Sequence, residues 1–405
     1  MHARNTAPLG AGFRTLWAAS AISTVGDGIT LAAGPMIVAS ITREPVPVAV
    51  AAFSQQLPWL LFGLVSGVVV DRLDRRRMIV TVNVARAVSL GVLAAAAALG
   101  AVTLPLIYAV FFALGTADTL ADTASGALLP ALVAQDRLAE ANARLSLTFN
   151  IGNQFLAKPL GAWLFALAVG APFATDAVTF AVAAALIATL RPIRTTPPPA
   201  TIAARTPLRQ DVTTGARWLA HHRILRAVSL SMCIGNTVFC AAFSVFVLYV
   251  RERLGLTGLG YGLLLTTFAI GGTLGTLSVR YLKQRYRAAT LLRAGLFIEA
   301  FTHAALATTT HVWIAAPVLI LFGTHAMVWG SVASTLYQQA VPDELRGRVG
   351  SVRILCDLGG AALGTIAGGF LTQGLGLATL FWVAAVVMLT VAAVSWRPLG
   401  PATIQ

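Results

Sequence analysis

The sequence predicts an all-α polytopic membrane protein, with twelve transmembrane helices arranged as two six-helix pseudo-repeats. Three observations support this prediction: an apolar composition, twelve apolar stretches of membrane-spanning length, and landmarks that recur at one spacing. Of 405 residues, 57% are hydrophobic and only 11% are charged, whereas soluble domains carry about a quarter charged residues. So few charges cannot cover a soluble surface. The composition therefore excludes a soluble enzyme, a disordered chain and a disulfide scaffold.

The apolar stretches define the individual spans. An α-helix crosses the ~30 Å hydrocarbon core in about 20 residues. The first stretch runs to about Ser40, well beyond the ~7–15 residues of a signal-peptide core, so it is read as a retained span. The predicted spans are residues 13–40, 46–70, 78–100, 103–128, 145–168, 171–190, 226–250, 258–280, 288–308, 312–336, 350–373 and 375–396.

Basic residues predict the orientation. With the N-terminus inside, 24 of the 29 Lys and Arg residues fall in loops and helix ends on the cytoplasmic side. The opposite side holds Arg43, Arg251 and Arg253, while Arg86 and Lys158 lie within spans. Cytoplasmic loops carry the excess of Lys and Arg, so both termini are predicted to be cytoplasmic. The formal net charge of +14 thus reflects the membrane, and nucleic acid is not expected as a partner.

The chain divides into two halves around a long basic segment. We expect an N-terminal six-helix half over 1–190, a cytoplasmic linker with a short surface helix over 191–225, and a C-terminal half over 226–405. The halves echo each other: Gly67 and Gly275, Gly26 and Gly235, and Asp136 and Asp343 are each about 208 residues apart. Two parallel repeats are one of the arrangements that transporters use.

Ionisable residues inside the spans are candidates for function, because a charge in the bilayer centre is costly. Asp27 lies midway along the first span between two glycines, and either faces a central cavity or pairs with a base such as Arg86. Asp118 and Asp122 share one helical face, where two like charges favour protonation of one of them; the alternative is a structural cluster with neighbouring threonines.

Further intramembrane charges lie in other spans. Glu299 is central in the ninth span and is read either as functional or as a partner of His303 one turn on. Lys158 precedes a proline in the fifth span and could neutralise Asp118 or Asp122. Arg353 and Asp357, four residues apart, are predicted to form a structural pair, and Arg86 is a further structural candidate. The candidates for proton coupling or substrate binding are Asp27, Asp118, Asp122, Lys158 and Glu299.

The segment Gly67-x-x-x-Asp71-Arg72-x-x-Arg75-Arg76 resembles the loop between helices two and three of the major facilitator superfamily. The resemblance implies the major facilitator fold, and for these five residues a conformational gate that latches the two halves. The sequence departs from the family pattern at its second glycine, where Asp74 stands. Other segments, including Thr24–Asp27 and Val341–Arg348, are similar to the drug and siderophore exporter branch, with macrolide-efflux and enterobactin-export proteins.

The expected function is secondary active efflux from the bacterial cell membrane. Since the sequence has no P-loop, a proton gradient is the simplest energy source, exchanged for a small hydrophobic or amphipathic compound such as an antibiotic or a siderophore. The alternatives are a proton-coupled metabolite importer on the same fold, in which Lys158 or Arg86 would matter most, and a membrane sensor that does not transport. No enzyme activity, metal or cofactor is expected, and the predicted state is a monomer.

Overall fold

The computed structural model describes residues 9–72, 74–190 and 208–400, and within these ranges the ordered elements are helices, with no strand. Each of the twelve predicted spans coincides with a helix or, for the fifth, with a run of three consecutive helical segments. The first six are α1 (Ala11–Ile41), α2 (Pro45–Arg72), α3 (Arg75–Ala98), α4 (Leu104–Leu132), α5 (Leu138–Phe149) with η2 (Asn150–Ala157) and α6 (Lys158–Leu167), and α7 (Ala171–Ala188). The last six are α9 (Arg223–Ser244) with α10 (Phe246–Leu248), α11 (Gly258–Arg285), α12 (Ala288–Thr308), α13 (Val312–Ala340), α14 (Arg346–Leu375) and α15 (Leu377–Ser395).

Ten of the described helices are long and apolar enough to cross a membrane. The remaining two predicted spans are α12 and the segment from α5 to α6, which is interrupted by η2. The twelve-span prediction from the sequence is confirmed at the level of helix positions. The helix ends differ from the predicted ones by a few residues, most at the ends predicted to be cytoplasmic, where α4 and α14 extend past the predicted spans.

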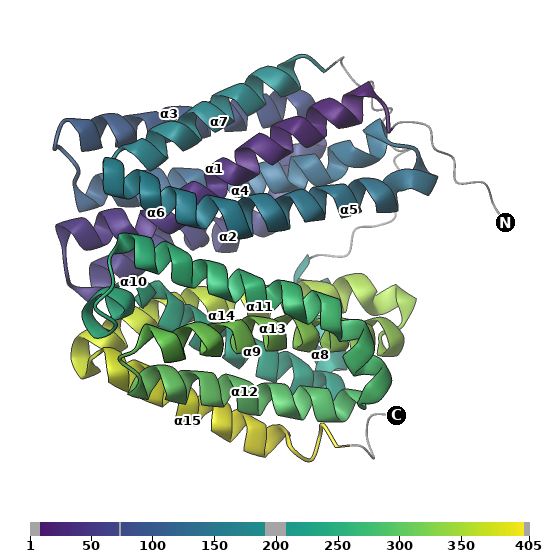
Figure 1. Cartoon of the computed structure of the whole chain (residues 1–405). Helices are drawn as coiled ribbons and strands as arrows, with labels where there is room; N and C mark the ends of the chain where they lie inside the picture. Colours follow the sequence, from purple (N-terminus) through teal and green to yellow (C-terminus); the bar gives the residue numbers. More distant parts are fainter. Residues whose placement is uncertain (1–8, 73, 191–207, 401–405) are drawn as a thin grey trace. The chain divides into compact units, whose positions relative to one another are not determined.

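The described chain separates into two compact units. One unit comprises residues 1–37 and 54–199, and the other comprises residues 38–53 and 200–405. Figure 1 colours the helices by sequence, from purple through teal for α1 to α7 and from teal through green to yellow for α8 to α15. The end of α1 and the beginning of α2 thus belong with the second unit, a feature that the predicted division at 191–225 does not contain.

In the first unit, α3 packs against α7 and α4, and Figure 1 shows α3 and α7 side by side. Their core is a cluster of aliphatic side chains and Phe13 drawn from α1, α3, α4 and α7. Small residues allow close approach of membrane helices. A Cβ atom at Gly161 of α6 would lie 2.5 Å from the Ile29 carbonyl oxygen of α1, so these two backbones are in direct contact.

The fifth span contains a π-helical segment, η2, directly before Pro159. Proline has no N–H to donate to the carbonyl of the preceding turn, so the regular α-helical ladder is interrupted there. The π-turn absorbs that interruption and turns Asn153 toward α1, where its side-chain amide donates to the Thr24 carbonyl at 3.1 Å. π-Bulges of this kind are frequent at functional sites.

In the second unit, α11 packs against α13, α9 against α14, and α12 against α15 and α13. The predicted surface helix is present as α8 (Leu208–His221). Its apolar face packs on protein: Leu219 is buried with Val349 and Val352 of α14, and a Cβ atom at Gly215 would lie 2.5 Å from the Arg348 carbonyl oxygen.

Asp74, which precedes α3, stands where the family pattern has its second glycine, and its backbone conformation does not require glycine. Asp74 has φ −64° and ψ 113°, an extended conformation open to any residue, and its side chain accepts a hydrogen bond from the Arg77 amide at 2.8 Å. It therefore caps the N-terminus of α3. Arg76 donates to the carbonyl oxygens of Ile187 and Ala188 and ties the start of α3 to the end of α7.

Short 3-10 helices precede the fifth and eleventh spans at equivalent positions of the two repeats, η1 (Gln135–Arg137) and η4 (Asp343–Leu345). Glu140 accepts from Arg137 at 2.7 Å and from Arg144 at 2.9 Å. The hydrogen bond from Arg137 and the positive charge of both arginines lower the pKa of Glu140. In the second unit, Arg346 pairs with Asp343 at 2.7 Å.

Candidate functional site

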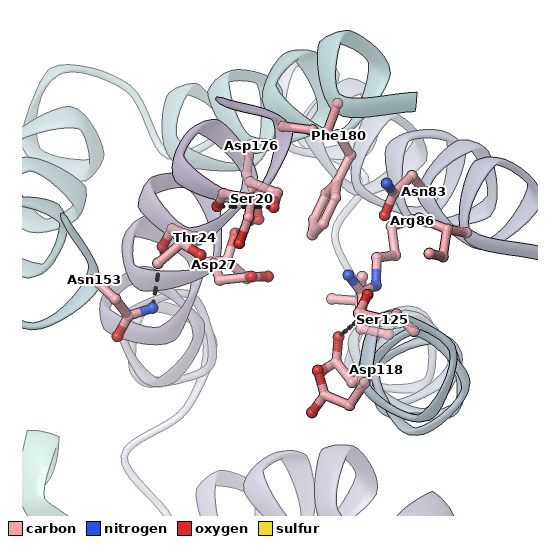
Figure 2. A pocket seen from close by; sticks show the side chains of 18 of the residues that line it. Ser20, Thr24, Asp27, Asn83, Arg86, Asp118, Ser125, Asn153, Asp176 and Phe180 are labelled. Atoms are coloured by element: carbon pink, nitrogen blue, oxygen red, sulfur yellow. Dashed lines mark hydrogen bonds and ion pairs between the residues drawn. The ribbon is translucent and has the colours of Figure 1, made fainter. Parts of the chain in front are cut away.

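The first unit contains a cavity of about 430 Å³ whose wall is rich in polar side chains. Every helix of this unit contributes to the wall except α6. Figure 2 shows Asp27 on one side of the cavity and Arg86 with Asp118 on the other. The polar and ionisable lining residues are Ser20, Ser23, Thr24, Asp27, Thr30, Gln55, Asn83, Arg86, Asp118, Asp122, Ser125, Asn153, Gln154 and Asp176.

Asp27 is positioned by the two glycines that flank it. A Cβ atom at Gly26 would collide with the Asp176 carboxylate and the Thr179 hydroxyl of α7, and one at Gly28 would lie 2.5 Å from the Ala157 Cβ of η2. The α1 backbone is therefore held directly against both neighbours at this level. Asp27 lines the cavity, and its carboxylate has no hydrogen-bond or ion-pair partner among the residues that the structure describes.

Arg86 pairs with Asp118 and not with Asp27, the carboxylate that the sequence suggested as its possible partner. Its Nη2 donates to Asp118 Oδ1, and the guanidinium lies 4.9 Å from the centroid of the Phe180 ring. Gln55 adds a side-chain hydrogen bond to Asp118. Arg86 is 6% exposed, so the carboxylate supplies the countercharge that a buried guanidinium requires. The pair links α3 to α4.

Asp122 lies one turn beyond Asp118 on the same face of α4 and also lines the cavity. Asp176 of α7 lines it too, but is buried and accepts hydrogen bonds from Thr30 at 2.5 Å and Thr179 at 2.9 Å. Asp176 therefore joins α7 to α1, since Thr30 belongs to α1.

Lys158 is buried, and its Nζ donates to Gln154 Oε1 at 2.5 Å. In the described part of the chain no carboxylate lies within ion-pair distance of it. The sequence allowed Lys158 to neutralise Asp118 or Asp122. It does not pair with either of them, because its ammonium group donates to Gln154, four residues earlier in the same span. It reaches the cavity only through Gln154, which is a lining residue.

In the second unit, Glu299 lies near His325 of α13, with 3.7 Å between Glu299 Oε2 and His325 Nε2. The neighbour expected from the sequence was His303, whose two ring nitrogens have no hydrogen-bond partner within the described ranges.

Arg353 and Asp357, which the sequence predicted to pair, form no ion pair among the described residues. The Arg353 guanidinium lies over the Tyr337 ring, 5.4 Å from its centroid.

Of the five residues proposed for the conformational gate, Arg75 and Arg76 are described and begin α3. Gly67 and Arg72 fall within the bounds of α2, but the side chains of Gly67, Asp71 and Arg72 lie outside the described residues. The gate assignment therefore stays a prediction for all five positions.

Sequence reasoning did not identify several lining residues. Asn83 lies three residues before Arg86 and shares its face of α3, so the position of Arg86 could have indicated it. Gln55 and Asn153 gave no comparable signal, because their places depend on how α2 and η2 meet their neighbours. Within the described ranges, no group of three or more His, Cys, Asp or Glu residues could hold a metal ion.

With the fold and the cavity described, comparison with known proteins identifies the family. A family model described as transmembrane secretion effector matches residues 3–403. The chain belongs to this family, within the major facilitator superfamily. The resemblance inferred from the loop between the second and third spans and from the branch motifs is therefore confirmed.

Relatives of this facilitator include pumps and exporters. The multidrug efflux pump Tap of Mycolicibacterium fortuitum is 27% identical over 386 residues, which cover 91% of each chain. The enterobactin exporter EntS of Escherichia coli is 26% identical over 365 residues, covering 87% of this chain and 83% of the exporter. Both alignments span nearly the whole facilitator.

Solved structures show the same fold. A bacterial homologue of the iron transporter ferroportin has a TM-score of 0.74 at 18% identity, over 97% of this chain and 100% of its own. A bacterial homologue of the lysosomal transporter Spinster has a TM-score of 0.76 at 12% identity, over 95% and 96%. The facilitator is accordingly a multi-pass membrane transporter of small molecules, and not an enzyme.

Proposed function

We propose that the chain is a secondary active efflux transporter that exchanges protons for a small hydrophobic or amphipathic compound, such as an antibiotic or a siderophore, by alternating access. The single observation that carries the proton-coupling part is Asp27: an intramembrane carboxylate that lines a cavity without a partner among the described residues. An unpaired carboxylate at membrane depth is costly when ionised, and binding a proton or a cationic group removes that cost.

The surroundings of Asp27 contain three further carboxylates and one guanidinium. Arg86 is within electrostatic range of Asp27 but pairs with Asp118, while Asp118, Asp122 and Asp176 add negative charge around it. Asp27 therefore has no described side chain in direct contact that compensates its charge, and it lies between two glycines midway along its span. Asp122 is the second candidate for carrying the proton, since it too lines the cavity without a described partner.

Export as the direction of transport is supported by the relatives whose names describe an efflux pump and an exporter. The alternative, an importer with Lys158 or Arg86 as the substrate contact, has less support. Arg86 is already neutralised by Asp118, and Lys158 is engaged by Gln154. The amide of Gln154 does not neutralise the charge of Lys158, but Lys158 is not among the residues that line the cavity.

Inverted membrane vesicles test this proposal. An acidic lumen should drive accumulation of an exported dye, and dissipation of the pH gradient should abolish it. Asp27→Asn should reduce gradient-driven accumulation to the level of vesicles without the protein, at unchanged expression. Glu344→Gln is the matched control, because Glu344 is an exposed carboxylate of η4 and its removal should change nothing. Accumulation that ignores a pH gradient of either sign would refute proton antiport.

We also propose that the protein resides as a monomer in the bacterial cell membrane with both termini in the cytoplasm, as the distribution of basic residues predicts. A C-terminal fusion to green fluorescent protein should fluoresce, whereas a C-terminal alkaline phosphatase fusion should be inactive. The reverse pattern would place the C-terminus outside and overturn the orientation.

A further inference from the structure

The second unit contains a cavity of its own, which the proposed proton exchange does not use. It measures about 390 Å³ and is lined by residues of α9, α11, α12, α13 and α14. Volumes of this size accommodate drug-sized molecules. Its wall differs in chemistry from that of the first cavity, because it contains no lysine or arginine and includes Phe239, Phe268, Phe322 and Trp329.

Three phenylalanines form one continuous aromatic surface in this wall. The Phe239 ring of α9 stacks with Phe268 of α11 at a centroid distance of 6.0 Å and with Phe322 of α13 at 5.6 Å, and Phe268 lies 5.7 Å from Phe322. Trp329 adds an indole whose Nε1 donates to the Leu292 carbonyl at 3.2 Å. Aromatic faces of this kind attract cations through their negative quadrupole.

Glu299 supplies a carboxylate at the edge of this aromatic surface. It is 9% exposed, and no described residue forms a hydrogen bond with it. The 3.7 Å between Oε2 and His325 Nε2 is longer than a hydrogen bond. The described lining also includes Asp357, but no lysine or arginine. The lining therefore places no permanent positive charge opposite Glu299, and His325 compensates the carboxylate only when it is protonated.

Two glycines make room for these polar groups. A Cβ atom at Gly235 of α9 would lie 3.1 Å from Glu299 Oε1, and one at Gly295 of α12 would lie 2.8 Å from His325 Nδ1 and 2.6 Å from Trp329 Cδ1. His325 is 7% exposed, and its Nδ1 has no hydrogen-bond partner in the described part of the chain. Glu299 and His325 thus face the cavity with unused hydrogen-bonding capacity.

We propose that this second cavity is a binding site for an aromatic organic cation, with Glu299 as the anionic contact and Phe239, Phe268 and Phe322 as the stacking surface. The ring faces stabilise both the aromatic body and the positive charge of such a ligand, and the carboxylate gains the countercharge that the described protein does not give it. An anionic ligand would meet two carboxylates and no basic lysine or arginine. The site stands on residues of the second unit and does not require proton exchange at Asp27.

Equilibrium binding to the purified full-length protein tests the site, at neutral pH and without any gradient. Ethidium, a planar aromatic cation, and N-phenyl-1-naphthylamine, a neutral aromatic compound, serve as fluorescent probes. Glu299→Gln should weaken ethidium binding by about tenfold and leave the neutral probe within about twofold. Glu344→Gln should change neither affinity.

A second variant keeps the test decisive if Glu299→Gln folds poorly. Phe239→Leu removes the central ring of the stack and should weaken ethidium binding by several fold. Unchanged ethidium affinity in either folded variant, or equal loss of both probes in Glu299→Gln, would overturn the cation site. Because binding is measured without a gradient, failure here leaves the vesicle experiment on proton exchange unaffected, and failure of that experiment does not alter the binding result.

Discussion

Arg86 and Glu299 lie equally far from the start of equivalent helices of the two repeats: Arg86 is the twelfth residue of α3 (Arg75–Ala98), and Glu299 is the twelfth of α12 (Ala288–Thr308). Each faces an opposite partner on the following span, Asp118 on α4 and His325 on α13. The acid and the base are exchanged between the repeats. The first unit pairs a permanent cation with an acid, whereas the second faces an acid with a histidine, whose charge depends on protonation.

The Arg86–Asp118 pair predicts a strong asymmetry between single and double substitutions. Asp118→Asn leaves a buried guanidinium without its countercharge and should destabilise the protein by about 3–5 kcal/mol. Arg86→Gln combined with Asp118→Asn leaves no uncompensated charge and should cost less than Asp118→Asn alone. Thermal unfolding in detergent measures the two single variants, Arg86→Gln and Asp118→Asn, and the double variant. A double variant whose cost equals the sum of the two single costs would show that the pair is not coupled.

Gly26→Ala should disrupt the packing of α1 on α7. The added Cβ atom would collide with the Asp176 carboxylate and the Thr179 hydroxyl, and overpacking of this kind costs about 1–3 kcal/mol or more. We expect a lower melting temperature and loss of gradient-driven accumulation. Gly91→Ala is the matched control, since Gly91 is helical and has no neighbouring atom within 4 Å of a Cβ. Equal effects of the two substitutions would contradict the close approach at Gly26.

Asp74→Ala removes the hydrogen bond that caps α3 and should lower stability by about 0.5–2 kcal/mol. Asp74→Gly restores the residue of the family pattern and should cost only a few tenths of a kcal/mol relative to Asp74, because glycine is a tolerated cap. Melting curves of the two variants and of Asp74→Ser, which keeps an acceptor, measure the difference. A cost for glycine larger than that for alanine would mean that the aspartate does not act as a cap.

The spans and their order were predictable because bilayer thickness fixes helix length and few charges interrupt the apolar stretches. Asp27 was predictable for a related reason, since a charge between glycines in a span is conspicuous. The partners of the buried charges were not predictable. Arg86 pairs with Asp118 and not with Asp27, and Glu299 faces His325 and not His303. Helix rotation and packing decide which helix faces meet. The π-turn over Asn150–Ala157 also lay beyond the sequence, although Pro159 marks the place.

His303 provides a last prediction, because it is buried among aromatic rings without a described hydrogen-bond partner. Its ring lies 6.2 Å from both Phe322 and Phe381 by centroid, and it is 3% exposed. Replacing a buried polar group that lacks partners by an apolar one of similar size is nearly neutral or stabilising. His303→Leu should therefore keep or raise the melting temperature and retain gradient-driven accumulation in vesicles. His325→Leu is the comparison, because it removes the group that faces Glu299 and should lower the melting temperature. A His303→Leu variant that is stable but no longer responds to the pH gradient would show instead that His303 takes part in proton exchange.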